Sequence, residues 1–141
     1  MQLNTYLHFA DNCREAFEFY RSAFGGEFSW IATFADGPAE MPPVPDDEKE
    51  LIMHVSLNIG DSVLMGSDTT SAFGPPPNVG NNYSVSVSAD SREETDRLFS
   101  ALSEGGNVAM PPADMFWGAY FGMCTDKFGV NWMVSCETTS E

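Results

Sequence analysis

The stretch FWGAYFGMCTDKFGVNWMV occupies residues 116–134 and contains two apolar runs separated by polar residues and a glycine. Aromatic and apolar residues of this kind suit pleated, half-buried strands. Between the runs, Asp126 can bond its own backbone and Gly129 can adopt a positive φ angle, which is the chemistry of a tight turn. The stretch therefore predicts a β-hairpin, with strands at about 117–125 and 130–136.

One face of the first predicted strand carries two glycines. Gly118, Tyr120 and Gly122 share this face because side chains alternate along a strand. Glycines weaken a strand unless another part of the chain or a ligand must come close. The face is therefore either a tight packing contact or the floor of a ligand site, and the sequence leaves both open.

The composition is that of one acidic globular domain. A chain of 141 residues can bury a sizeable core. Its 21 acidic and 6 basic residues give a net charge of −15, which would repel nucleic acid and an anionic membrane. No apolar run has the length of a membrane span and the N-terminus lacks a signal pattern, so we expect a cytoplasmic protein. Three cysteines without paired spacing argue against disulfides and a cysteine zinc site, and we expect them to be buried apolar residues: Cys13, Cys124 and Cys136.

The chain contains an internal repeat. A shift of 78 residues places Asn4 on Asn82 and the segment 20–24 on 98–102. Each half reads strand, helix and three strands, and the Pro-rich segment 69–80 connects them. The predicted modules are 1–68 and 81–137, with helices around 12–24 and 91–104 and strands at 6–9, 28–34, 51–58, 62–66, 83–87, 107–110, 117–125 and 130–136.

Helix ends are marked by their own signals. Asn12 with Glu15 and Ser91 with Glu94 have the spacing of capping boxes. The pairs at 25–26 and 105–106 are both Gly-Gly and are expected to end the helices. The prolines gather in loops, with a further pair, Pro111 and Pro112, after the strand predicted at 107–110.

Two such modules predict an α+β fold. Neither module could bury both faces of a four-stranded sheet alone. Together they could form an eight-stranded mixed sheet curved around a cavity, with the helices outside. Such a concave space is a natural place for a ligand.

The residues of the repeat resemble a known family over nearly the whole chain. The segments that carry the resemblance are YLHF at 6–9, NCREAFEFY at 12–20, FGG at 24–26, IMHVSL at 52–57, LMGSD at 64–68, and the segment from WG at 117–118 through DKFG at 126–129 to WM at 132–133. The chain resembles the vicinal oxygen chelate superfamily, which includes glyoxalase I, extradiol dioxygenases and the fosfomycin and bleomycin resistance proteins. Within it, the chain looks like the PhnB-like branch, often labelled as a 3-demethylubiquinone-9 3-methyltransferase domain. The resemblance implies the glyoxalase/bleomycin resistance-like fold and a homodimer.

The resemblance also implies where a metal would lie. Enzymes of the superfamily hold one divalent ion with His, Glu or Gln side chains from the first and fourth strands of each half. In this sequence those positions correspond to Asn4, Met65, Asn82 and Met133. Amide and thioether groups do not hold a catalytic divalent ion at such a site. We therefore predict no metal and no other cofactor, with a divalent metal as the alternative.

Other catalytic patterns are missing from the sequence. There is no nucleophile elbow, phosphate-binding loop or dinucleotide fingerprint. A methyltransferase would need a glycine-rich turn for its adenosyl cofactor, whereas Gly25 and Gly26 are expected to end a helix. Methyltransferase activity is therefore not predicted.

The two histidines both fall in predicted strands. His8 has the parity of Asn4 and Tyr6, which would point it into the cavity. It is either a structural histidine at a strand end or a ligand contact or general base, and His54 has the same two interpretations. The predicted ligand-binding cavity residues are Tyr6, His8, His54, Met65, Trp117, Tyr120 and Met133.

Three functions are compatible with these features. The first is a metal-free small-molecule-binding homodimer, which sequesters or senses its ligand. The second is a lyase or dioxygenase-like enzyme with a relocated metal site that uses His8 or His54. The third is an interaction dimer whose cavity is filled by its own side chains.

Overall fold

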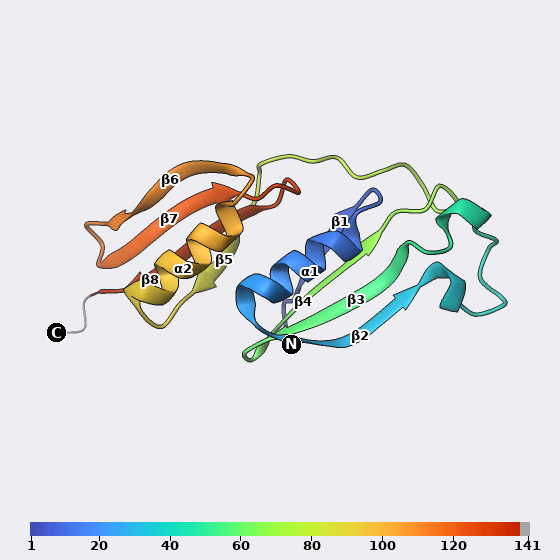
Figure 1. The fold of residues 1–141 in the computed structure, drawn as a ribbon, viewed down its shortest axis with the longest axis horizontal. Helices are drawn as coiled ribbons and strands as arrows, with labels where there is room; N and C mark the ends of the chain where they lie inside the picture. Colours follow the sequence, from blue (N-terminus) through green and yellow to red (C-terminus); the bar gives the residue numbers. More distant parts are fainter. Residues whose placement is uncertain (139–141) are drawn as a thin grey trace. The chain divides into compact units, whose positions relative to one another are not determined.

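A computed structural model describes residues 1–138, which divide into two compact units, the first covering Met1–Asn78 and the second beginning at Val79 (Figure 1). The first unit contains β1 (Thr5–Phe9), α1 (Cys13–Phe24), β2 (Glu27–Thr33), β3 (Ile52–Ile59), β4 (Ser62–Asp68) and two short 3-10 helices, η1 (Phe34–Asp36) and η2 (Asp46–Glu48). The second contains β5 (Val85–Ser88), α2 (Arg92–Ser103), β6 (Asn107–Asp114), β7 (Ala119–Thr125) and β8 (Asn131–Glu137).

Each unit has one mixed four-stranded sheet. The strand order is β1-β4-β3-β2 in the first unit and β5-β8-β7-β6 in the second. In each sheet one parallel pair, β1 with β4 or β5 with β8, adjoins antiparallel neighbours. The predicted α+β fold of two βαβββ modules is confirmed, but the eight strands form two sheets of four rather than one sheet of eight.

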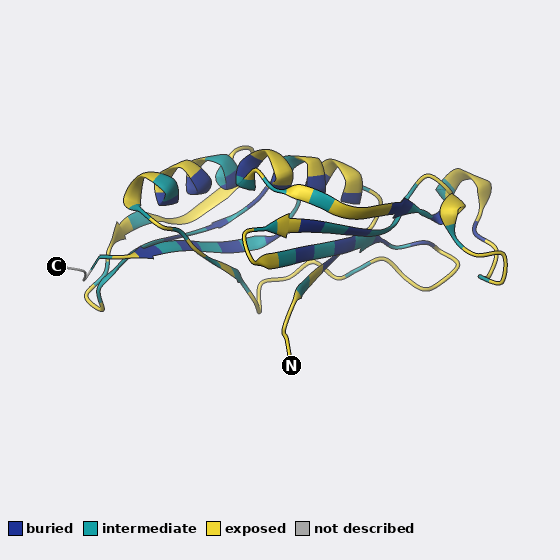
Figure 2. Ribbon diagram, turned by 90° about the horizontal axis from the view of Figure 1, so that it is seen from below, coloured by how far each residue is buried: buried dark blue, intermediate teal, exposed yellow. Residues whose placement is uncertain are grey.

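Each helix covers one face of its own sheet (Figure 2). Side chains facing the helix are buried, such as Leu7, Val55 and Leu57 in the first unit. The alternate positions along the same strands are half-buried or exposed. We call the side of each sheet that carries these alternate residues the helix-free face.

The two Gly-Gly pairs end the helices as predicted. Gly25 and Gly105 have φ angles of 79° and 76°, which glycine adopts at little cost. The next glycines pack against backbone: a Cβ on Gly26 would lie 1.8 Å from the Asn58 carbonyl oxygen, and one on Gly106 would lie 2.1 Å from that of Thr125. Gly25 is the C-cap of α1, whereas Glu104 is the C-cap of α2 and the Gly-Gly pair follows it.

The C-terminal hairpin forms as predicted, over β7 and β8. Asp126 Oδ1 accepts hydrogen bonds from the backbone N–H groups of Phe128 (2.8 Å) and Val130 (3.0 Å), and Gly129 has a φ of 93°. A Cβ on Gly122 would lie 3.0 Å from the Phe99 ring of α2. At Gly122 the structure thus favours the tight packing contact over the ligand floor.

The strand β6 continues past the point where the sequence predicted its end. It runs to Asp114, through Pro111 and Pro112, with an irregular register between Met110 and Ala113. This is possible because β6 lies at the edge of its sheet, where a proline breaks no ladder on the outer side. The prediction that the strand stops near residue 110 is wrong for this reason.

The two helices begin in different ways. Asn12 makes no side-chain capping bond, so the first predicted capping box is wrong. Instead the buried carboxylate of Asp68, at the end of β4, accepts hydrogen bonds from the N–H groups of Cys13 (2.9 Å) and Ile52 (2.8 Å). Burial raises the pKa of Asp68, and the two amide donors oppose that rise.

The cap predicted at Ser91 is confirmed, although the Glu94 side chain returns to the N–H of Asp90 rather than to that of Ser91. Ser91 Oγ accepts a hydrogen bond from the Glu94 N–H (3.1 Å), while Glu94 Oε1 accepts one from the N–H of Asp90 (3.0 Å). This is a local motif, made entirely within one turn of chain.

The three cysteines are buried and unpaired, as predicted. Burial raises the pKa of Cys13, and it raises that of Cys124 to about 11. Thiols of this kind stay protonated and unreactive at neutral pH.

Within residues 1–138, neither helix has the length and apolar character needed to cross a membrane.

Candidate functional site

The helix-free face of the first sheet brings together four residues predicted from the sequence: Tyr6, His8, His54 and Met65. The strand register pairs Tyr6 with Met65, and Met65 with Ser56 on the other side. Three neighbouring strands thereby place a phenol, a thioether and a hydroxyl in one row.

A chain of hydrogen bonds crosses this face. The Tyr6 hydroxyl and His54 Nδ1 are 3.1 Å apart, and His54 Nε2 and Ser56 Oγ are 3.0 Å apart. The Tyr6 ring also packs against His8, with centroids 5.1 Å apart. A neutral imidazole donates from one nitrogen and accepts at the other, so the two hydroxyls can present either a donor or an acceptor to a ligand. The chain can therefore adapt to either kind of polar group.

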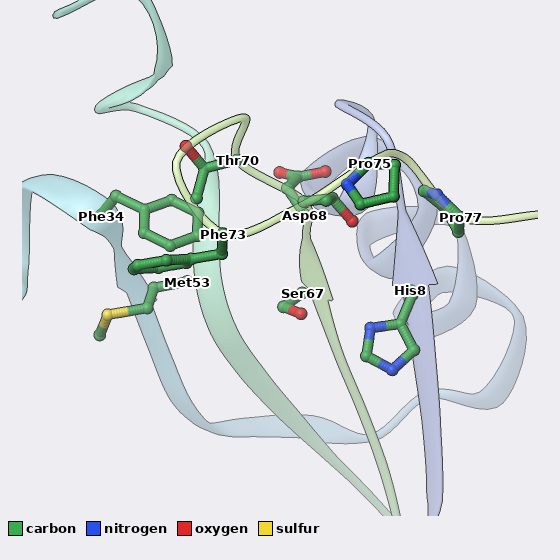
Figure 3. Close-up of a pocket in the computed structure, with 10 residues that line it drawn as sticks. His8, Phe34, Met53, Ser67, Asp68, Thr70, Phe73, Pro75 and Pro77 are labelled. Carbon is green, nitrogen blue, oxygen red and sulfur yellow. The ribbon is translucent and has the colours of Figure 1, made fainter. Parts of the chain in front are cut away.

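A pocket of about 530 Å³ lies at one end of this face (Figure 3). Phe34, Phe73 and Met53 gather at one end of it, and His8 lies at the other, with Ser67 between them. The ten lining residues are His8, Phe34, Met53, Ser67, Asp68, Thr69, Thr70, Phe73, Pro75 and Pro77. The volume is in the usual range for a small-molecule site.

The wall of the pocket formed by residues 69–77 is fastened to η2. Glu48 Oε1 accepts hydrogen bonds from Thr70 Oγ1 (2.5 Å) and from the N–H of Ser71 (3.0 Å), and both Glu48 oxygens lie 3.1 Å from Ser71 Oγ. The Thr70 hydroxyl, then the Ser71 N–H, hold the pKa of Glu48 below its ordinary value. Three successive prolines, beginning at Pro75, stiffen the rest of the wall.

The helix-free face of the second sheet has a different character. Ser86 pairs with Met133, which pairs with Met123. Trp117 lies in the exposed loop before β7, with its ring 6.0 Å from that of Phe121. Met133 therefore lies in a row with a hydroxyl and a second thioether, and neither of its register partners is a histidine.

Tyr120 lies on the other side of the second sheet. Its hydroxyl donates a hydrogen bond to Asp96 Oδ1 of α2 (2.6 Å), and the Arg92 guanidinium lies over its ring. The bond to Asp96, followed by burial, raises the pKa of Tyr120. The structure thus places Tyr120 under the helix, away from the face that carries Met133, because the face shared with Gly122 is the helix-facing one.

The side chains at the positions implied for a metal do not fit a divalent ion. Asn4 and Asn82 precede the first strand of each unit, and the register places Tyr6 and Ser86 beside the methionines instead. Thioether and hydroxyl groups are poor ligands for a catalytic divalent ion. Within residues 1–138, no three His, Cys, Asp or Glu side chains form a group that could hold a metal.

Several residues that line or support the candidate site were not identified from the sequence. Ser56 could have been found, because it alternates with His54 along one strand. Phe34, Phe73 and Glu48 could not, since they lie in irregular segments whose contacts are made between distant parts of the chain.

Comparison with known proteins places this geometry in context. Residues 2–134 match the family model of the Glyoxalase/Bleomycin resistance protein/Dioxygenase superfamily. Protein YjdN from Escherichia coli strain K12 is 32% identical over 148 residues, which cover 96% of this chain and 95% of that protein.

Solved structures of similar fold include two with high coverage. Protein PA1353 from Pseudomonas aeruginosa is 45% identical, with a TM-score of 0.85 over 97% of this chain and 98% of the other. The PhnB protein from Bacillus cereus, which bears the name of a 3-demethylubiquinone-9 3-methyltransferase, is 23% identical, with a TM-score of 0.76 over 96% and 99%. The second likeness concerns the fold alone.

Proposed function

Because the chain belongs to the Glyoxalase/Bleomycin resistance protein/Dioxygenase superfamily, we propose that it is a metal-free homodimer that binds a small molecule in order to sequester or sense it. The observation that carries this proposal is the helix-free face of the first sheet. There Tyr6, His54 and Ser56 form a hydrogen-bonded chain, and His8 leads to the pocket. A concave, mostly apolar space with a few polar groups is the usual form of a small-molecule site.

The roles of the residues follow from their chemistry. The hydroxyls of Tyr6 and Ser56 orient a polar group of the ligand, while His54 sets which of them donates. Met65 lies between them in the row and adapts to ligand shape, because its side chain is flexible and polarisable. On the second unit, Met133 and Trp117 are the proposed ligand contacts.

A thermal-shift screen with metal-stripped full-length protein tests ligand binding. We expect some members of a broad panel of small molecules to raise the melting temperature. Tyr6→Phe, which removes only the hydroxyl, should reduce the shift. Tyr83→Phe is the matched control, since Tyr83 is a similarly exposed tyrosine of the second unit. A panel without any stabilising compound would contradict the proposal.

Elemental analysis separates this proposal from the enzymatic alternative. The donor groups on the helix-free faces support a protein that binds its ligand without metal. Near-stoichiometric Zn, Ni, Mn or Fe in carefully purified protein would instead favour a lyase or dioxygenase-like enzyme, with His8 or His54 among the ligands. Loss of that metal in His8→Ala or His54→Ala would identify the site.

Light scattering of the eluting protein tests the homodimer. We expect a mass twice that of the 15.4 kDa chain. A monomeric mass at micromolar concentration would contradict this part of the proposal.

A further inference from the structure

The pocket of the first unit has a lining that selects among ligands by shape and by charge. We infer that it takes an aromatic ligand without negative charge, whose ring packs against Phe73, and this inference rests on the proposed small-molecule function.

The apolar lining is suited to a flat ring. Phe34 and Phe73 lie with ring centroids 6.0 Å apart at an interplanar angle of 55°. Phe73 is 51% exposed, so much of its ring surface is not covered by protein. Aromatic groups prefer offset or tilted contacts of this kind, and a ligand ring can extend the pair. Met53, Pro75 and Pro77 supply further apolar surface.

The charges around the pocket disfavour an anion. None of the ten lining residues is Lys or Arg. The one acidic lining residue, Asp68, already accepts hydrogen bonds at both oxygens, from the N–H groups of Cys13 and Ile52. The whole chain carries a net charge of −15. An anionic ligand would therefore be repelled by a negative potential and would find no fixed positive partner in the lining. A cationic ligand would be attracted by the same potential, and a neutral ligand would be little affected.

The pocket is also held in shape before a ligand arrives. Glu48 fastens the wall through Thr70 and Ser71, and Thr70 is only 1% exposed. A preformed wall spares the ligand the entropic cost of ordering it. Within the lining itself, the polar side chains left to orient a ligand are His8, Ser67 and Thr69, each of which can offer a donor or an acceptor.

Three fluorescent probes of different charge test this inference on the full-length protein. They are thioflavin T (cationic), Nile red (neutral) and 1-anilinonaphthalene-8-sulfonate (anionic), titrated at about pH 8 so that histidines are ordinarily neutral. We expect thioflavin T to bind about tenfold more tightly than the anionic probe. Phe73→Ala should weaken thioflavin T binding about fivefold, because the ring contact is lost. Phe116→Ala is the control, since Phe116 is a 97% exposed aromatic residue of the second unit.

A second variant tests the charge argument without removing an aromatic ring. Ser67→Lys adds a cation to the lining and should reverse the preference, so that the anionic probe binds more tightly than thioflavin T. Tighter binding of the anionic probe to the unaltered protein would overturn the inference and leave the proposed function standing. Equal effects of Phe73→Ala and Phe116→Ala would overturn the assignment to this pocket. Failure of all three probes to bind would count against both the inference about this pocket and the proposed small-molecule function.

Discussion

The two units share a fold but carry different chemistry on their helix-free faces. Met65 and Met133 hold corresponding places, in the middle strands β4 and β8. Around Met65 stand Tyr6 and Ser56, with both histidines of the chain nearby. Around Met133 stand Ser86 and Met123. The repeated backbone therefore specifies the sheet, while the side chains at equivalent positions differ. The first unit has a hydrogen-bonded chain through His54, and the second has two methionines beside Ser86.

The two units also differ in where they place a buried carboxylate. Asp68 ends β4 and fastens the start of α1, whereas the corresponding place in β8 is occupied by Cys136, and α2 is capped by its own Ser91. The hairpin turn of the second unit depends on buried Asp126, whereas the turn between β3 and β4 has the exposed Asp61. Each unit thus stabilises equivalent places by different means.

Asp126→Ala should produce the largest loss of stability. Its carboxylate accepts hydrogen bonds from the N–H groups of Phe128 and Val130 and from Trp132 Nε1 (2.9 Å), and all three donors would lose a charged partner. We expect the free energy of unfolding to fall by about 3 kcal/mol, measured by urea denaturation. Asp61→Ala should change it by less than about 0.5 kcal/mol, and an equal loss in both variants would remove the distinction between the two turns.

Asp68→Ala should have the next largest effect. The N–H groups of Cys13 and Ile52 would lose their buried acceptor, which we expect to cost about 2 kcal/mol in the same assay. Asn12→Ala is the control, because Asn12 makes no capping bond and its removal should cost less than about 0.5 kcal/mol. The opposite order would show that α1 is capped by its own sequence after all.

Ser91→Ala should cost less than the loss of Asp68. It removes a single local cap, the acceptor for the Glu94 N–H, and a change of about 1 kcal/mol is expected. Ser91→Asp should restore the stability, since aspartate caps a helix equally well. If Asp does not rescue the variant, the effect arises from something other than the cap.

Glu48 should make the smallest contribution to stability. Its effect should be confined to the pocket wall at residues 69–77 and should depend on pH. The pKa of Glu48 in the folded protein lies below its ordinary value. Its stabilising effect is therefore fully present at pH values above the ordinary pKa of a glutamate. It should be lost as the pH falls through the lowered pKa. Hydrogen exchange of the Ser71 amide should follow this loss of protection. In Glu48→Gln the Ser71 amide should be less protected from exchange, and its degree of protection should no longer change over this pH range. Glu50→Gln should resemble the unaltered protein.

Local patterns in the sequence predicted most of the fold. The hairpin around Asp126, the Gly-Gly helix ends and the Ser91 cap were predictable because each is made by residues close together in the chain. The cap at Asp68 was not, since its donors lie 55 and 16 residues away. The single shift of 78 was also too simple: α1 and α2 begin 79 residues apart, at Cys13 and Arg92, and β1 and β5 begin 80 apart, at Thr5 and Val85.

The candidate site was predictable only where a local pattern along one strand fixes the direction of the side chains. Strand alternation placed Tyr6 and His8 on one face, and the family resemblance added Met65, which the register pairs with Tyr6. His54 was singled out as the second histidine in a predicted strand. Alternation alone does not say which face a helix will cover, so Tyr120 was assigned to the cavity although it bonds Asp96 of α2. The wall with Phe73 lies in a segment without periodicity, where only the folded structure reveals the contact with Phe34.

Mapping a bound ligand by NMR tests most directly whether the helix-free face of the first sheet is the binding site. The probe is whichever of the three dyes binds most tightly, added to isotopically labelled full-length protein. We predict the largest amide shifts at residues 6–8, 53–56 and 65–73, with smaller shifts around the proposed contacts Trp117 and Met133 of the second unit. Largest shifts around Trp117 and Met123, with the first unit unaffected, would contradict the assignment of the site.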